Sequence, residues 1–149
     1  MKKTAKNLVD EAMVQVTTYT VEQARALHGH PGVQFVDLRD VRELEREGVI
    51  PGAVHAPRGM LEFWVDPESP YHRDVFAQDK EYVLFCAAGW RSALATKTLM
   101  DMGFERTVLI AKVQFRRRRE DDGTRTPLLK PKLRLMFAHL ARCFNQAPS

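Results

Sequence analysis

The 149-residue sequence predicts an α/β protein in which a five-stranded parallel sheet is covered by helices on both faces, giving three layers. Three observations predict this class. Five short runs with strand composition alternate with segments of helical periodicity. One run, residues 82–86, is apolar throughout, as in a strand buried on both faces. The length suits one domain with a sizeable core, and a hydrophobic content of 44% is ordinary for a globular protein.

The individual elements follow from local signals. The predicted strands are residues 17–19, 33–39, 53–55, 82–86 and 107–110. The predicted helices are residues 8–16, 20–27, 40–48 and 93–100. Two of these helices open on capping pairs, Thr20 with Gln23 and Asp40 with Glu43, and Gly48 ends the second. The same logic predicts that Ser92 caps the last helix.

The stretch around Cys86 predicts a reactive site. The central apolar run ends at this cysteine, and a short loop with Gly89 leads to Arg91 and Ser92 at the start of a helix. A helix N-terminus carries unpaired N–H groups and a partial positive charge, so it favours an anion. A thiol in this position, near a guanidinium, should ionise more readily than an ordinary thiol. We therefore interpret Cys86 as a nucleophile, the alternative being a small buried core residue.

Four residues, 87–90, separate Cys86 from Arg91, so successive backbone N–H groups can curve into a small anion-binding nest. The pattern Cys-x-x-Gly-x-Arg-Ser resembles the active-site loop of the rhodanese (sulfurtransferase) family. Two further stretches resemble rhodanese signatures, Asp-x-Arg-x-x-x-Glu and Gly-x-Ile-Pro-Gly-Ala. They match at Asp37, Arg39, Glu43, Gly48, Ile50, Pro51, Gly52 and Ala53. The resemblance covers residues 17–110 and implies the three-layer rhodanese fold.

The resemblance implies a sulfurtransferase that carries sulfur as a persulfide on Cys86. The donor would be thiosulfate or a similar small anion, and the acceptor cyanide, a small thiol or a protein thiol. No metal or organic cofactor is required. The substrate-binding residues would be those of the loop, Ala87, Ala88, Gly89, Trp90, Arg91 and Ser92. Supporting roles would fall to Asp37, Arg39 and Arg58.

Several alternatives remain open. Asp37 and Arg39 either contact substrate or form an ion pair that fixes the loops. The bulky Trp90 is also consistent with a non-enzymatic module that binds a partner or carries sulfur only within a complex. A phosphatase is a third class, but the phosphatases that resemble rhodaneses have one more residue between the cysteine and the arginine. The segment around Arg58, with its prolines and aromatic residues, could form a lid over the loop.

Charge divides the chain unevenly. Residues 107–149 contain ten Lys/Arg and three Asp/Glu, whereas residues 1–106 contain thirteen and sixteen. After the last strand the rhodanese pattern of a Gly-Gly pair and a tryptophan is absent, and residues 116–119 are four arginines. We interpret this stretch as sequence drift or a local change of reading frame rather than a nucleic-acid patch, since no nucleic-acid motif accompanies it. The predicted organisation is a helix at 1–16, a domain at 17–123 and a basic tail at 124–149.

Other features bear on the environment of the protein. Two cysteines, Cys86 and Cys143, do not make a disulfide framework, and Cys143 falls beside the apolar stripe of a predicted amphipathic helix in the tail. Polar residues interrupt what would be a signal core near the N-terminus, and no apolar run reaches membrane-spanning length. The sequence therefore predicts a cytoplasmic protein, with no nucleic-acid or membrane partner expected. His28 and His30 indicate a solvated turn rather than a metal site.

Overall fold

The structure is a computed structural model that describes residues 1–113. The helices in this range are α1 (Ala5–Gln15), α2 (Val21–Leu27), α3 (Val41–Glu47), α4 (Leu61–Val65), the 3-10 helix η1 (Asp74–Phe76) and α5 (Trp90–Asp101). The strands are β1 (Thr18–Tyr19), β2 (Val33–Asp37), β3 (Val54–His55), β4 (Glu81–Phe85) and β5 (Thr107–Ile110). The predictions for the arginine run, the terminal helix and Cys143 lie outside the described residues.

The sheet confirms the predicted class. Within residues 1–113 five strands form one sheet in the order β1-β5-β4-β2-β3, and every pair is parallel. The apolar strand β4 lies in the centre, between β5 and β2. Its register with β2 pairs Val33 with Glu81 and Asp37 with Phe85, so the two strands begin and end together. The loops that leave β2 and β4 therefore meet at one edge of the sheet.

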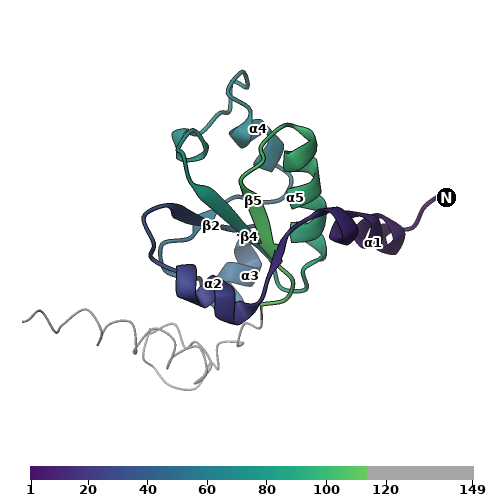
Figure 1. Ribbon diagram of the computed structural model, residues 1–149, viewed down its shortest axis with the longest axis horizontal. Coiled ribbons are helices and arrows are strands. Elements are labelled where there is room, and N and C mark those ends of the chain that lie inside the picture. Colours follow the sequence, from purple (N-terminus) through teal and green to yellow (C-terminus); the bar gives the residue numbers. More distant parts are fainter. Residues whose placement is uncertain (114–149) are drawn as a thin grey trace, which may run out of the picture.

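Alternate residues of β4 face two separate cores. Tyr82 and Leu84 pack in a cluster with residues of α4 and α5, whereas Val83 and Phe85 pack in a second cluster with Ala24 of α2. All four of these strand residues are buried. Figure 1 shows the resulting layers, with α5 and α4 on one side of the sheet and α2 on the other. The central strand is thus covered on both faces, as its composition predicts.

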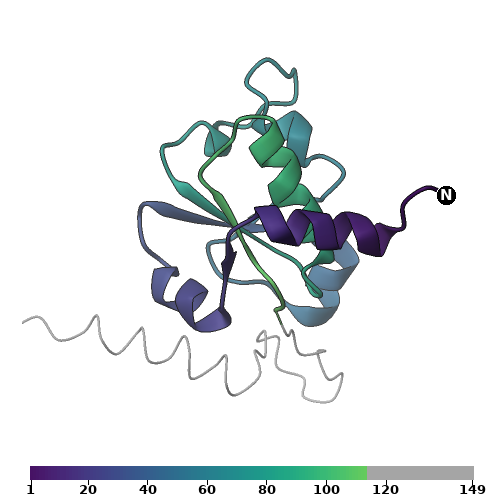
Figure 2. The same ribbon diagram turned by 45° about the vertical axis from the view of Figure 1, so that its right-hand side comes forward.

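Helix α1 packs against the last helix. Val9, Ala12 and Val16 are buried in a cluster with Ala93 of α5 and Leu109 of β5. Figure 2 shows α1 crossing in front of α5, and Figure 1 shows it extending outward beside that helix. The helix predicted for residues 1–16 therefore shares a core with the sheet. No helix in the described part of the chain is both long and apolar enough to cross a membrane.

The predicted helix starts at Thr20 and Asp40 are confirmed. Thr20 forms a reciprocal capping box with Gln23, and Asp40 forms one with Glu43. Gly48 ends α3 with a φ of 81°, as the glycine predicts. The cap at Asp40 directs the chain from the end of β2 straight into α3. This places the charged first turn of α3 at the same edge of the sheet as the end of β4.

Candidate active site

The loop after β4 lies at the carboxyl edge of the sheet. Cys86 comes directly after the last residue of β4, and α5 begins four residues later at Trp90. Open α/β sheets bind their ligands at this edge, because loops from neighbouring strands meet there. The turn from β2 into α3 lies beside it, since β2 is hydrogen-bonded to β4 along its whole length. The Cys86 loop and the stretch from Asp37 to Glu43, which both resemble rhodanese signatures, are thus neighbours in space.

The Cys86 sulfur is buried and is contacted by polar groups of its own loop. The residue is 1% exposed. The backbone N–H of Gly89 donates to Sγ at 3.2 Å, and the Ser92 hydroxyl lies 3.8 Å from Sγ. An N–H donor aimed at sulfur stabilises a thiolate more than a thiol, because hydrogen bonds to charged acceptors are stronger. The loop thus supplies one N–H group of the predicted nest.

The prediction that Ser92 caps α5 is wrong. The helix begins at Trp90 with Gly89 as its N-cap residue, and Ser92 lies inside the first turn. Its hydroxyl donates to the Gly89 carbonyl at 2.9 Å. Gly89 has a φ of 86°, a left-handed conformation that turns the chain into the helix without a side-chain cap. The serine instead ties the first turn of α5 to the loop beside Cys86.

Arg91 is held by a residue that the sequence alone does not place in the site. Glu43 of α3 accepts two hydrogen bonds from its guanidinium, at 2.6 and 2.8 Å. These bonds hold the pKa of Glu43 at about 2. They also raise the pKa of Arg91, an effect to which the nearby Cys86 side chain adds. From the sequence, Glu43 is predicted only as a helix-capping residue and as part of a rhodanese-like motif. Its position at the same edge of the sheet as Arg91 is the signal that could have identified it as a partner of that arginine.

Glu43→Gln is expected to lower the free energy of unfolding by about 1 kcal/mol near neutral pH, because the pair is partly exposed. The folded-state pKa of Glu43 lies below its ordinary value, so the stabilisation is present above that value and disappears as the pH falls toward about 2. Urea unfolding near neutral pH and at about pH 3 should therefore show the deficit shrinking in acid. Glu45→Gln, on the exposed side of α3, is the control. A deficit independent of pH would contradict this account.

Asp37 and Arg39 are buried together. Arg39 is 0% exposed, and its guanidinium donates to both Asp37 carboxylate oxygens, the shortest contact being 2.7 Å. It also donates to the Gly48 carbonyl at 2.8 Å and lies 3.5 Å from a Glu47 carboxylate oxygen. These contacts join the end of β2 to the end of α3. They favour the interpretation in which the ion pair fixes the loops.

The other predicted site residues occupy two places. Ala87 is half-buried, while Ala88 is exposed and Trp90 is 52% exposed, so these residues form the rim of the loop. Arg58 instead pairs with Glu62 of α4 and donates to Thr98 at 3.4 Å. Thr98 lies in the second half of α5, so Arg58 lies along the helix, away from its N-terminal end. Helix α4 itself packs against α5.

His28 and His30 each form a hydrogen bond with the backbone of a neighbouring segment. His28 bonds through Nε2 to the Pro51 carbonyl at 2.8 Å, and His30 accepts from the Gly32 N–H at 3.2 Å. Both histidines thus take part in the local structure of the turn in which the sequence places them. Among residues 1–113, no three His, Cys, Asp or Glu side chains lie close enough together to hold a metal ion.

This arrangement defines a class: an α/β domain with a buried cysteine in a loop between the central parallel strand and a helix N-terminus. Comparison with known families agrees with it. The rhodanese-like domain model matches residues 20–112. The chain therefore belongs to the rhodanese-like domain family, as its motifs predict.

Three relatives illustrate the range of this family. YtwF of Bacillus subtilis, named as a candidate sulfurtransferase, is 40% identical over 70 residues, which span 46% of this chain and 60% of YtwF. A Rhodopseudomonas palustris structure, described as a protein of unknown function and candidate tyrosine phosphatase, is 47% identical with a TM-score of 0.73, covering 75% of this chain and 86% of that one. A single-domain sulfurtransferase of Saccharomyces cerevisiae is 27% identical with a TM-score of 0.51, covering 64% and 83%.

Proposed function

We propose that this chain transfers sulfane sulfur through a persulfide on Cys86. The observation that carries the proposal is the Gly89 N–H directed at the Cys86 sulfur, 3.2 Å away, in a loop at the N-terminus of α5. A persulfide is more acidic than a thiol and carries its negative charge on the outer sulfur. Preorganised N–H donors and a helix N-terminus stabilise such a charge at little reorganisation cost.

The reaction has two displacement steps. The Cys86 thiolate attacks the outer sulfur of thiosulfate; the sulfur–sulfur bond of thiosulfate breaks, and its electron pair leaves with sulfite. Cys86 then carries the transferred sulfur as a persulfide anion. In the second step the acceptor, which is cyanide, a small thiolate or a protein thiolate, attacks the outer persulfide sulfur and releases the Cys86 thiolate. The chain ends unchanged, so neither step requires an oxidant or a reductant.

Residues around Cys86 have separate roles in this scheme. The Gly89 N–H donates to the sulfur. Arg91 adds a positive charge, and its two hydrogen bonds to Glu43 fix the position of its guanidinium. The Ser92 hydroxyl holds the Gly89 peptide in place. The exposed indole of Trp90 lies on the rim, where a donor or acceptor would enter. Asp37 and Arg39 fix the neighbouring turn.

Mass spectrometry after thiosulfate treatment tests the proposal. We expect an adduct of about 32 Da, one sulfur atom, on the peptide containing Cys86. Cys86→Ser should abolish both the adduct and thiosulfate turnover, because a serine hydroxyl is not ionised under these conditions. Cys143→Ser is the matched control and should retain both. Unchanged turnover in the Cys86→Ser variant would overturn the assignment.

A non-enzymatic module is the second candidate, favoured by one observation. Cys86 is 1% exposed while Trp90 beside it is 52% exposed, so the loop presents an indole rather than a thiol to solvent. Such a module would bind a partner through the rim or receive sulfur only within a complex. Turnover of thiosulfate by the isolated protein would exclude pure binding. A reactive Cys86 without turnover would support the module.

A phosphatase is the third candidate, because one relative is described as a candidate tyrosine phosphatase. Four residues separate Cys86 from Arg91 here. A ring this tight suits the outer sulfur of a persulfide better than a tetrahedral phosphate. We therefore expect no hydrolysis of p-nitrophenyl phosphate under conditions in which Cys86 accepts sulfur. Hydrolysis that depends on Cys86 would favour the phosphatase.

A further inference from the structure

A pocket of about 180 Å³ lies at the edge of the sheet opposite to Cys86. It is lined by residues that precede or begin three neighbouring strands, among them Val33 and Gln34 of β2, Gly52 before β3, and Lys80 before β4. Cys86 comes after the other end of β4. The five residues of this strand span about 17 Å at about 3.3 Å per residue, so the pocket is separate from the sulfur site.

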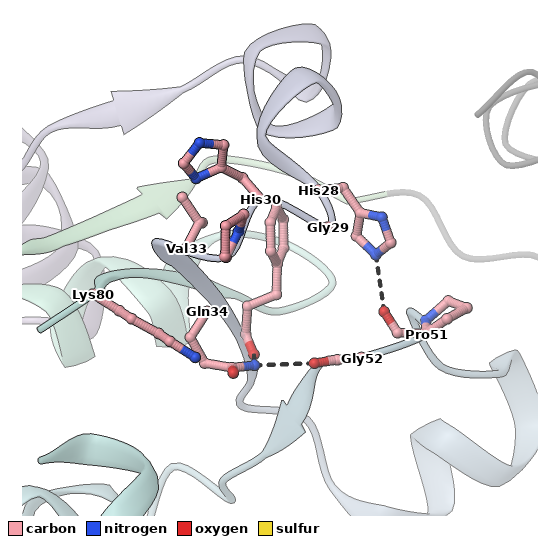
Figure 3. A pocket seen from close by; sticks show the side chains of 10 residues that line it. His28, Gly29, His30, Val33, Gln34, Pro51, Gly52 and Lys80 are labelled. Atoms are coloured by element: carbon pink, nitrogen blue, oxygen red, sulfur yellow. Dashed lines mark hydrogen bonds between the residues drawn. The ribbon is translucent and has the colours of Figure 1, made fainter. Parts of the chain in front are cut away.

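Side chains tie the walls of the pocket together. The amide of Gln34 donates to the Gly52 carbonyl at 3.0 Å, and also to the Phe35 carbonyl at 3.1 Å. His28, at the end of α2, bonds to the adjacent Pro51 carbonyl. Figure 3 shows both links converging on residues 51 and 52 from different elements. Because two side chains hold this turn, the pocket is formed before any ligand arrives.

Part of the pocket lining is apolar. Phe35 is buried, and its ring and that of His28 meet edge to face with centroids 5.5 Å apart. Val33, Pro31 and Pro51 complete this surface. The Gln34 amide nitrogen uses both hydrogens on backbone carbonyls, so its carbonyl oxygen is the atom left for other contacts. The apolar lining residues thus offer a contact surface for a small apolar group of a ligand.

Among residues 1–113, one lysine and no carboxylate line the pocket. The side chain of Lys80 extends along its edge toward the Gln34 amide (Figure 3). Within residues 1–113, Lys80 forms no ion pair, although carboxylates flank it in sequence. Asp79 pairs with Arg106, and Glu81 accepts from the Tyr19 hydroxyl. The ammonium group is thus available to an anion at the pocket edge.

We propose that this pocket binds a small monocarboxylate with an apolar body. The carboxylate pairs with Lys80, and the body lies against Phe35 and Pro51. The volume sets an upper limit on size, because ligand pockets for larger molecules begin at about 300 Å³. A single aromatic ring or a short branched chain fits this limit. The site is independent of sulfur transfer and goes beyond the function proposed above.

Three small-molecule probes separate the contribution of the carboxylate to binding from that of the aromatic ring. Benzoate carries both the ring and the carboxylate; benzamide keeps the ring without the charge, and acetate keeps the charge without the ring. We expect benzoate to shift the backbone amide signals of the lining residues 28–30, 33–35, 52 and 80 in nitrogen-15 NMR spectra of the full chain, with saturation and a Kd of about 1 mM. Benzamide and acetate should each bind at least several times more weakly.

A pair of variants tests the role of the cation. Lys80→Gln should weaken benzoate binding by about three- to fivefold, the range of a partly exposed ion pair. Lys97→Gln, which removes a lysine of α5 paired with Asp101, should leave binding unchanged. Dispersed spectra of both variants verify that they fold. Equal binding of benzoate and benzamide, shifts that do not saturate, or an unaltered Kd in Lys80→Gln would each overturn the proposal.

Discussion

Gly89→Ala is expected to lower the free energy of unfolding by about 3 kcal/mol or more and to abolish sulfur transfer. Two effects add. Gly89 has a φ of 86°, where a side chain costs about 1–2 kcal/mol. A β-carbon at this position would also lie 1.7 Å from the Ala111 carbonyl oxygen, which is backbone and has to move. Either Ala111, just beyond β5, or the loop must shift, and the N–H directed at Cys86 shifts with it.

Gly103→Ala is the matched control for this prediction. Its φ is 85°, nearly the same as that of Gly89, yet an added β-carbon would meet no atom within 4 Å. It should therefore show the conformational cost of about 1–2 kcal/mol alone and keep the persulfide adduct. Thermal unfolding and the mass of thiosulfate-treated protein measure both effects. Equal stability of the two variants, with the adduct retained in both, would mean that the Ala111 contact does not shape the site.

The parts of the fold that could be predicted are those that local sequence determines. The buried run before Cys86 and the capping residues Thr20 and Asp40 are recognised from spacings of a few residues, and the structure confirms them. The alternation of strands and helices then restricts the sheet to parallel pairing. The order of the strands and the exact register depend on packing between distant segments. Those details come only from the structure.

The parts of the site that escaped prediction depend on long-range contacts. Glu43 and Arg91 are 48 positions apart, and only the pairing of β2 with β4 brings them together. The approach of Ala111 to Gly89 likewise requires β5 to lie beside β4. The cap predicted at Ser92 is wrong because the positive φ of Gly89 starts the helix earlier. None of these three features can be recognised from the spacing of residues along the chain.

Arg39→Met is expected to lower the free energy of unfolding by about 3–5 kcal/mol, because it leaves the buried carboxylate of Asp37 without its partner. The side chains of Arg39 and Asp37 are 0% and 3% exposed, so water cannot replace the lost bonds without opening the core. The carbonyl of Gly48 also loses a donor at the end of α3. Because α3 carries Glu43, Arg91 should lose its support as well. Urea unfolding measures the loss of stability.

A second variant keeps this prediction testable if Arg39→Met does not fold. Asp37→Asn combined with Arg39→Met removes both charges, and it should recover part of the loss, since the main cost is an uncompensated buried charge. Arg42→Met is the surface control. Its side chain is 83% exposed in a pair with Asp40, so its effect should stay within about 0.5 kcal/mol. If Arg39→Met cost no more than Arg42→Met, the buried pair would not hold the end of β2 against α3, and direct contact with substrate would become the better account of Arg39.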